Sequence, residues 1–169
     1  MDSVKISEIF IKLSSSIKAS EAKPEGKYGV YGAQGLLGFL DTYQTDKESI
    51  AVIKDGAGIG RVQIIPSYSS VIGTMQLLVP IDGIDINYAF FLLTYLNLGG
   101  SFSGATIPHI YFKNYGRIDT RFRNHSEQIQ IGCSLSEIRK CQNDAGNEIL
   151  LLDSLVKSRF VNQEARSCY

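Results

Sequence analysis

The sequence is poor in the residues that build metal centres and disulfide frameworks. It contains two histidines, His109 and His125, and three cysteines, Cys133, Cys141 and Cys168. The histidines are not paired at ligand spacing, and no two cysteines form a CxxC motif. We therefore predict neither a metal site nor a disulfide framework. We interpret the cysteines as buried or incidental thiols rather than reactive ones.

The chain also lacks an excess of charge of either sign, because 17 basic residues balance 17 acidic residues. This balance excludes the strong global field of a protein that coats nucleic acid without sequence preference. A DNA-binding role would therefore need local basic clusters. No apolar run is long enough to span a bilayer, and no signal-peptide pattern is recognisable. We expect no membrane partner and a cytoplasmic location.

Motifs of familiar enzyme classes are missing as well. The sequence contains no GxSxG, HExxH or GxxxxGK[ST] motif, and no glycine-rich cofactor loop followed by the Asn-Pro-Pro-aromatic motif of methyltransferases. Its acidic residues are scattered without the spacing of a nuclease metal site. These absences favour a non-catalytic protein without a cofactor. The alternative is a cytoplasmic enzyme or small-ligand-binding domain with glycine-rich loops around a pocket, which turnover of a metabolite without DNA would support.

The composition is that of a globular domain with one appended element. The chain has 169 residues, of which 44% are hydrophobic and 20% charged, enough for one substantial core but short for two independent domains. Near the start, apolar residues recur at helical spacing and predict a short amphipathic helix after a brief strand. These residues are Ile6, Ile9, Phe10, Leu13 and Ile17. The polar stretch 18–27 that follows is interpreted as a loop.

Short apolar and β-branched runs, separated by turn residues, occupy positions 28–80. They predict strands near 36–40, 49–54, 61–65 and 74–79. Asp85 or Asn87 can then cap a helix that runs through Tyr95 and stops at Gly99 and Gly100. Residues 107–112 are expected to be extended.

Three glycine-rich stretches interrupt this pattern, at 28–35, 55–60 and 101–109. The stretch 55–60 superficially suggests a phosphate loop, but such a loop needs a helix directly after it, and residues 61–65 continue as a strand. We therefore interpret it as a hairpin turn. The other two are interpreted first as tight turns at sheet corners. Alternatively, loops of this kind expose polar side chains to a partner, here Gln34, Ser103, Thr106 or His109.

The most basic stretch of the chain covers residues 111–123, which contain four basic residues and a single acidic one, Asp119. The cations are Lys113, Arg117, Arg121 and Arg123, and tyrosines and phenylalanines lie between them. Such groups neutralise phosphates, arginine makes paired contacts to guanine, and aromatic rings pack beneath the cations. A solvated charged face is the alternative interpretation.

Beyond His125 the apolar residues follow alternating four- and three-residue steps, the pattern of a coiled-coil heptad. We call these residues the heptad face: Ile131, Leu135, Ile138, Ala145, Ile149, Leu152 and Val156, with Gln142 and Arg159 as its polar members. We predict a single long helix that starts at Ser126 or Glu127. Gly146, which costs about 1 kcal/mol in a helix, is a site where it could bend. The helix is interpreted as an assembly element, the alternative being the last helix of the core.

Five pieces of the sequence, in this order, resemble a known family. They are residues 28–39 (YGVYGAQGLLGF), 53–60 (IKDGAGIG), 86–93 (INYAFFLL), 104–110 (GATIPHI) and 126–128 (SEQ). Together they resemble one target-recognition domain followed by one helical spacer of a type I restriction–modification DNA-specificity subunit. The resemblance runs from Ile6 to Phe160. Residues 119–125 depart from it, because a proline-rich strand ending is common there.

The resemblance implies an α+β fold: a β-rich target-recognition domain with peripheral helices at 1–125, and a long C-terminal coiled-coil-type helix, for spacing and dimerisation, at 126–169. It implies a non-catalytic subunit that binds a half-site of double-stranded DNA and docks methyltransferase (modification) subunits, with a restriction/translocase subunit as a further partner. Full-length members carry two copies of this layout, so a half-length form with one copy is expected to be a homodimer. A truncated or recombined gene product is the third interpretation.

The candidate contact residues follow from the loops and basic clusters above. For DNA they are Lys27, Gln34, Lys54, Arg61, Lys113, Arg117 and Arg121. For dimerisation they are Ile138, Ile149, Leu152 and Val156.

Overall fold

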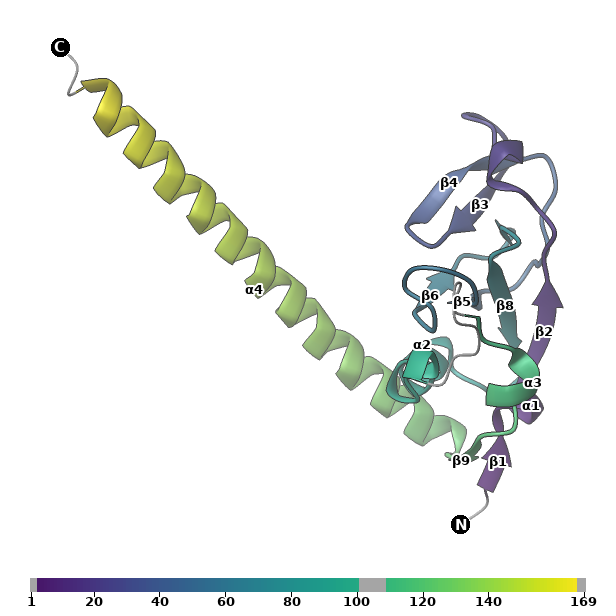
Figure 1. Ribbon diagram of the computed structural model, residues 1–169. Helices are drawn as coiled ribbons and strands as arrows, with labels where there is room; N and C mark the ends of the chain where they lie inside the picture. Colours follow the sequence, from purple (N-terminus) through teal and green to yellow (C-terminus); the bar gives the residue numbers. More distant parts are fainter. Residues whose placement is uncertain (1–2, 101–108, 167–169) are drawn as a thin grey trace. The chain divides into compact units, whose positions relative to one another are not determined.

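The computed structural model describes residues 3–100 and 109–166, the last six by backbone alone. The strands are β1 (Ser3–Lys5), β2 (Phe10–Ser14), β3 (Tyr28–Gly32), β4 (Gly35–Leu40), β5 (Ser49–Ile53), β6 (Val62–Ile65), β7 (Ser70–Val71), β8 (Met75–Pro80) and β9 (Asp119–Arg121). The helices are α1 (Ile6–Ile9), α2 (Ile86–Tyr95), α3 (Phe112–Tyr115) and α4 (His125–Arg166), with 3₁₀ helices at Ala19–Glu21 and Leu98–Gly100 (Figure 1). The chain forms two compact units, one ending at Gly132 and one beginning at Cys133. The α+β fold class is confirmed.

A four-stranded antiparallel sheet in the order β2-β8-β5-β6 lies at the centre of the first unit. All five residues of β5 are buried, because both faces of the sheet are covered. Successive side chains of a strand point to opposite faces. Accordingly, Ile50 and Val52 belong to one core cluster, whereas Ala51 and Ile53 belong to the other.

Helices cover the first face of this sheet. Ala89, Phe90 and Leu93 of α2 are buried there, and α2 packs against β5 and β6. The carboxylate of Asp85 caps α2 by accepting a hydrogen bond from the backbone N–H of Tyr88 at 2.8 Å, which satisfies one of the unpaired amides of the first turn. The predicted cap at Asp85 is therefore confirmed.

A three-stranded sheet in the order β4-β3-β7 covers the second face. β3 and β4 form an antiparallel hairpin, and β3 pairs with β7 in parallel. Side-chain amides fix this layer. Gln63 donates to the carbonyl of Gly32 at 2.7 Å, and Gln44 accepts from the backbone N–H of Val71 at 2.8 Å.

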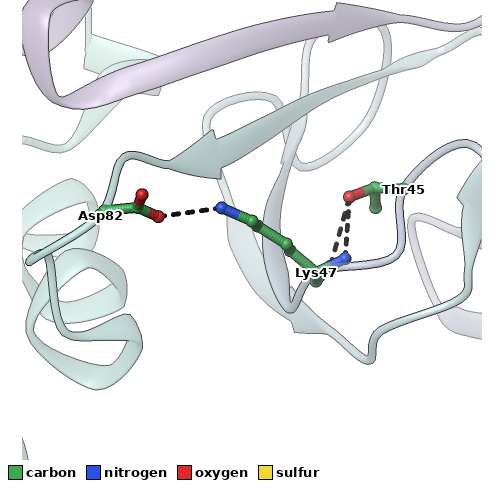
Figure 2. A network of polar contacts seen from close by, with 3 residues as sticks. All are labelled: Thr45, Lys47 and Asp82. Atoms are coloured by element: carbon green, nitrogen blue, oxygen red, sulfur yellow. Dashed lines mark hydrogen bonds and ion pairs between the residues drawn. The ribbon is translucent and has the colours of Figure 1, made fainter.

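The loop before β5 is tied to the turn after β8 by an ion pair (Figure 2). The ammonium of Lys47 lies 2.9 Å from the carboxylate of Asp82, and the hydroxyl of Thr45 accepts a hydrogen bond from the backbone N–H of Lys47 at 3.1 Å. The hydrogen bond and charge of the partner raise the pKa of Lys47 and lower that of Asp82. Both groups are exposed, so the pair orients the loop more than it stabilises the fold.

The predicted N-terminal helix is wrong for most of its length. The brief strand β1 precedes helix α1, as predicted, but α1 ends at Ile9 and strand β2 begins at Phe10. Residues 10–14 pair with β8 in register, with Leu13 opposite Leu77. Apolar spacing over so few residues fits a helix and a strand almost equally well, so long-range pairing with β8 decides the outcome.

The glycine-rich stretch 55–60 is a turn between β5 and β6, as predicted, and β6 follows it rather than a helix. Gly60 shows why glycine is needed, since its φ is +82° and a Cβ there would lie 2.1 Å from the backbone nitrogen of Gly99. No side chain fits so close to another backbone. The turn is thus packed against the segment that follows α2.

Helix α4 is continuous from His125 to Arg166, with no break at Gly146. It begins at His125, one residue before the earlier of the two predicted starts, Ser126 and Glu127, and Asn124 caps its first turn. The Asn124 side chain accepts from the Glu127 backbone at 3.0 Å, and the Glu127 carboxylate accepts from the Asn124 backbone at 3.2 Å. This reciprocal pair is a capping box. Among the described residues, no helix is both long and apolar enough to cross a membrane.

Candidate nucleic-acid interface

The seven predicted DNA contacts lie in separate regions of the first unit. Lys27 precedes β3, and Gln34 lies in the turn that joins β3 to β4. Six residues lie between them, and the five that form β3 span about 17 Å at the rise of a strand. Arg121 lies in β9, and the β1-β9 pair and the β3-β4 hairpin are at opposite ends of this unit (Figure 1). The structure therefore does not gather the seven residues into one patch.

Lys54 directly follows the last residue of β5, and its side chain is half-buried. Its backbone N–H donates to Thr74 at 3.1 Å, and its carbonyl accepts from Ile110 at 3.0 Å. Burial lowers the pKa of its ammonium, and the charge of Lys12 on β2 lowers it further. Two ammonium groups held near each other are a favourable position for a phosphate oxygen. Sequence reasoning missed Lys12, because its proximity to Lys54 depends on the pairing of β2 with β8.

The turn at 55–60 brings two further predicted residues beside Lys54. Arg61 is exposed, and its Nε donates to the carbonyl of Gly58 at 3.4 Å. His109 pairs through its Nδ1 with the carboxylate of Asp55. His109 also lies against the ring of Tyr111, with 4.0 Å between the ring centroids. Because Nδ1 of His109 is bonded to Asp55, this ring nitrogen is not available to bind a partner molecule.

The basic segment 111–123 is divided between α3 and β9 instead of forming one strip. Lys113 lies over the ring of Tyr111, with its ammonium 5.1 Å from the ring centroid, so this cation has an aromatic base as predicted. Tyr115, in contrast, is 5% exposed and belongs to the core. Arg117 and Arg121 are exposed on either side of the turn into β9.

Near Lys27 the structure reveals an aromatic group that sequence reasoning missed. Tyr28, Tyr43 and Tyr68 come from three separate segments and pack ring against ring; we call them the tyrosine cluster. The centroids of Tyr28 and Tyr43 lie 4.8 Å apart, and those of Tyr43 and Tyr68 lie 5.3 Å apart. The ammonium of Lys27 lies 5.1 Å from the centroid of Tyr28. Nothing in the local sequence signals this proximity.

The four predicted dimerisation residues are exposed apolar side chains on α4. Their exposed fractions are 55% for Ile138, 64% for Ile149, 61% for Leu152 and 52% for Val156. Leu151 and Leu155, at 70% and 53%, add to the apolar surface of the same stretch. Exposed apolar surface of this extent is typical of a helix that packs against a partner.

The remaining candidate ligand residues form no centre in the part of the chain that the structure describes. No group of three or more His, Cys, Asp and Glu side chains could hold a metal ion within residues 3–100 and 109–160. Cys133 and Cys141 are exposed on α4, so of the two interpretations of the thiols, buried or incidental, the buried one is wrong for this pair. Ser103, Thr106 and Cys168 lie outside the described residues.

Comparison with known proteins gives one family and one fold. A family model described as "Type I restriction modification DNA specificity domain" matches residues 1–149. A search of curated protein sequences gave no significant match.

The fold is similar to those of solved chains from type I restriction–modification systems. The S subunit from M. genitalium has 22% sequence identity and a TM-score of 0.66, over 82% of this chain and 39% of that one. A chain from a study of complex assembly and conformational transition of the type I R-M system has 16% identity and a TM-score of 0.66, with coverages of 82% and 38%. The HsdS subunit from Thermoanaerobacter tengcongensis has 16% identity and a TM-score of 0.61, with coverages of 82% and 37%. The present chain thus matches about two fifths of the length of these solved chains.

Proposed function

Because the chain belongs to the family of type I restriction–modification DNA specificity domains, we propose that it recognises one half-site of double-stranded DNA as a non-catalytic specificity subunit. The family match over residues 1–149 carries this proposal, since it covers the β-rich unit and the first half of α4. We retain the predicted division into a recognition domain at 1–125 and a spacer region at 126–169 as part of the proposal.

Phosphate binding would come from cations distributed over the recognition unit. Lys27, Lys113 and Arg117 are exposed, and the half-buried Lys54 is close enough to Lys12 for the charge of Lys12 to lower its pKa. Contacts of this kind supply affinity and orientation, whereas base-edge contacts from loop side chains supply specificity. Gln34 is exposed in the β3-β4 turn, and its side-chain amide is suited to reading a base edge. A balanced net charge is compatible with this role because the interaction is local.

The second part of the proposal is that two copies associate through the heptad face of α4. A closed two-fold dimer would supply the second recognition unit that a single chain lacks. Ile149 and Val156 occupy one heptad position, and Leu152 occupies the other, a combination common in two-stranded coiled coils. The resulting complex would read an interrupted palindrome with a spacing set by helix length.

Docking of methyltransferase subunits completes the proposed assembly, with a restriction/translocase subunit as a further partner. The decisive experiment is co-expression of the chain with the methyltransferase encoded by a neighbouring gene, followed by mapping of methylated bases in the host DNA. We expect methylation at a two-part target that disappears when the chain is omitted. Methylation that is unchanged without the chain would contradict the proposal.

An asymmetric target would keep DNA specificity but contradict homodimerisation. It would mean that the chain pairs with a different half-subunit. Co-purification of the chain with the methyltransferase tests the docking step separately, and we expect these two proteins to form a stable complex in the absence of DNA.

A further inference from the structure

The tyrosine cluster combines exposed rings with an unusual backbone. Tyr43 and Tyr68 are 44% and 52% exposed although their rings touch. Tyr68 has a φ of +56°, a conformation that a non-glycine residue adopts only at an energetic cost. If the cluster served packing alone, burial of these rings would be expected instead. The backbone therefore displays the ring of Tyr68 at the surface.

Backbone hydrogen bonds hold the two loops that carry these rings. The backbone N–H groups of Gln44 and Thr45 donate to the carbonyl of Ser69 at 3.1 and 3.4 Å, and that of Ser69 donates to Thr45 at 3.3 Å. Tyr43 and Tyr68 directly precede these bonded residues. Their positions are consequently fixed before any ligand arrives, which lowers the entropy cost of binding.

Lys27 gives this surface a positive charge without a carboxylate beside it. The neighbouring lysines are paired, Lys23 with Asp41 at 2.7 Å and Lys47 with Asp82 at 2.9 Å. Within the described residues no acidic side chain pairs with Lys27, which lies over the ring of Tyr28. Lysine is charged at neutral pH in any case, and the contact with Tyr28 raises the pKa of this ammonium further.

We propose that the ammonium of Lys27 and the hydroxyls of Tyr43 and Tyr68 bind phosphates of the DNA backbone beside the half-site. This inference rests on the proposed DNA-binding function and adds a non-specific contact surface to it. An ammonium and phenol hydroxyls are both donors, and phosphate oxygens are acceptors only. The contact sets the orientation of the recognition unit and does not distinguish one base sequence from another.

The test uses variants that keep ring packing but remove donors. In the full-length chain, Tyr43→Phe and Tyr68→Phe together remove two hydroxyls, and Lys27→Gln removes the charge. The matched controls are Tyr95→Phe, since Tyr95 is 85% exposed on α2, and Lys140→Gln on α4. The probes are a fluorescein-labelled random-sequence duplex and a duplex carrying the methylated target. Thermal unfolding by circular dichroism checks that each variant folds like the parent.

We expect the double tyrosine variant to bind both duplexes about tenfold more weakly, by the same factor, because each lost bond is to a charged phosphate. Lys27→Gln should reduce the slope of log affinity against log salt by about 0.9. Unchanged binding and slope would overturn the inference while leaving the proposed function intact. Unchanged DNA binding with loss of methyltransferase co-purification would also overturn it, in favour of a protein interface. Failure of the parent chain to bind either duplex would instead reject the proposed function itself.

Discussion

The side chain of Gln128 joins the first turn of α4 to the start of α2. Its Oε1 accepts a hydrogen bond from the backbone N–H of Asp85 at 3.0 Å, and its Nε2 donates to the carbonyl of Arg123 at 2.8 Å. Gln128 is 1% exposed, so water cannot replace these bonds. Asp85 in turn caps α2. One buried side-chain amide thus fixes the first turns of both α2 and α4. Gly132, one turn further along α4, lets this helix lie close to Asp85, because a Cβ at position 132 would be 2.7 Å from Oδ1 of Asp85.

Replacing Gln128 by Leu should destabilise the recognition unit by about 2 kcal/mol, because the backbone N–H of Asp85 and the carbonyl of Arg123, both partly buried, would lose their hydrogen-bond partner. Urea unfolding followed by circular dichroism measures this change. Gln130→Leu is the matched control, since Gln130 is exposed on the same helix and its replacement should change stability by less than about 0.5 kcal/mol. Equal stability of the two variants would show that the Gln128 bonds contribute nothing net.

Lys54→Met should raise the free energy of unfolding at neutral pH and weaken DNA binding. Burial and the charge of Lys12 lower the pKa of Lys54, so the folded chain holds this proton less tightly than the unfolded chain does. The charged Lys54 therefore lowers the free energy of unfolding. This destabilisation is fully present below the folded-state pKa of Lys54 and shrinks as pH rises toward the ordinary pKa of lysine. The stability gap between variant and parent should therefore narrow at alkaline pH. A gap that is constant from neutral to alkaline pH would argue against this cause.

Tyr115→Phe should stabilise the chain. The Tyr115 hydroxyl is buried and has no hydrogen-bond partner in the described part of the molecule, which costs about 1 kcal/mol or more. Burial also raises the pKa of this phenol. Above about pH 10 the unfolded chain would ionise it while the folded chain would not, so stability falls there. The stability of the Tyr115→Phe variant should therefore fall less above this pH than that of the parent. Urea unfolding at neutral and alkaline pH measures the difference.

Arg117→Ala and Arg121→Ala should each weaken DNA binding and reduce its salt dependence by about one released counterion. Both side chains are exposed, so the unfolding temperature should remain that of the parent. Fluorescence anisotropy over a range of salt concentrations measures the slope, with Lys140→Ala on α4 as the control for loss of one positive charge. If both variants keep the parent's affinity and slope, the segment 111–123 is a solvated face.

Leu152→Glu should convert the proposed dimer into monomers. The substitution would place an unpaired charge in the helix interface, at a cost of several kcal/mol. Ser154→Glu introduces the same charge on the same helix at an outward heptad position and should leave the dimer intact. Sedimentation velocity at micromolar concentration distinguishes the two states. A parent chain that is already monomeric would reject homodimerisation.

Local patterns in the sequence predicted much of the fold. The apolar, β-branched run around Ile50 and Val52 predicted strand β5, the heptad spacing predicted α4, and Asp85 was one of the two predicted caps of α2. In each case the determining interaction is short-range: side-chain periodicity along one element, or a hydrogen bond between residues three positions apart. The turn at 55–60 was predictable for the same reason, since glycines followed by strand residues favour a hairpin over a phosphate loop.

Only the tertiary structure decided which side chains share a surface. Residues 10–14 form a strand because β8 pairs with them, which local spacing could not reveal. Pairing of the loops through Thr45 and Ser69 brings Tyr43 and Tyr68 together, and Tyr115 lies in the core although its neighbours in sequence are basic. Basic residues close in sequence are divided between α3 and β9. The sequence alone determined elements such as β5, α2 and α4, because these depend on near neighbours. Strand β2 and the candidate DNA surface depend instead on contacts between segments far apart in the chain.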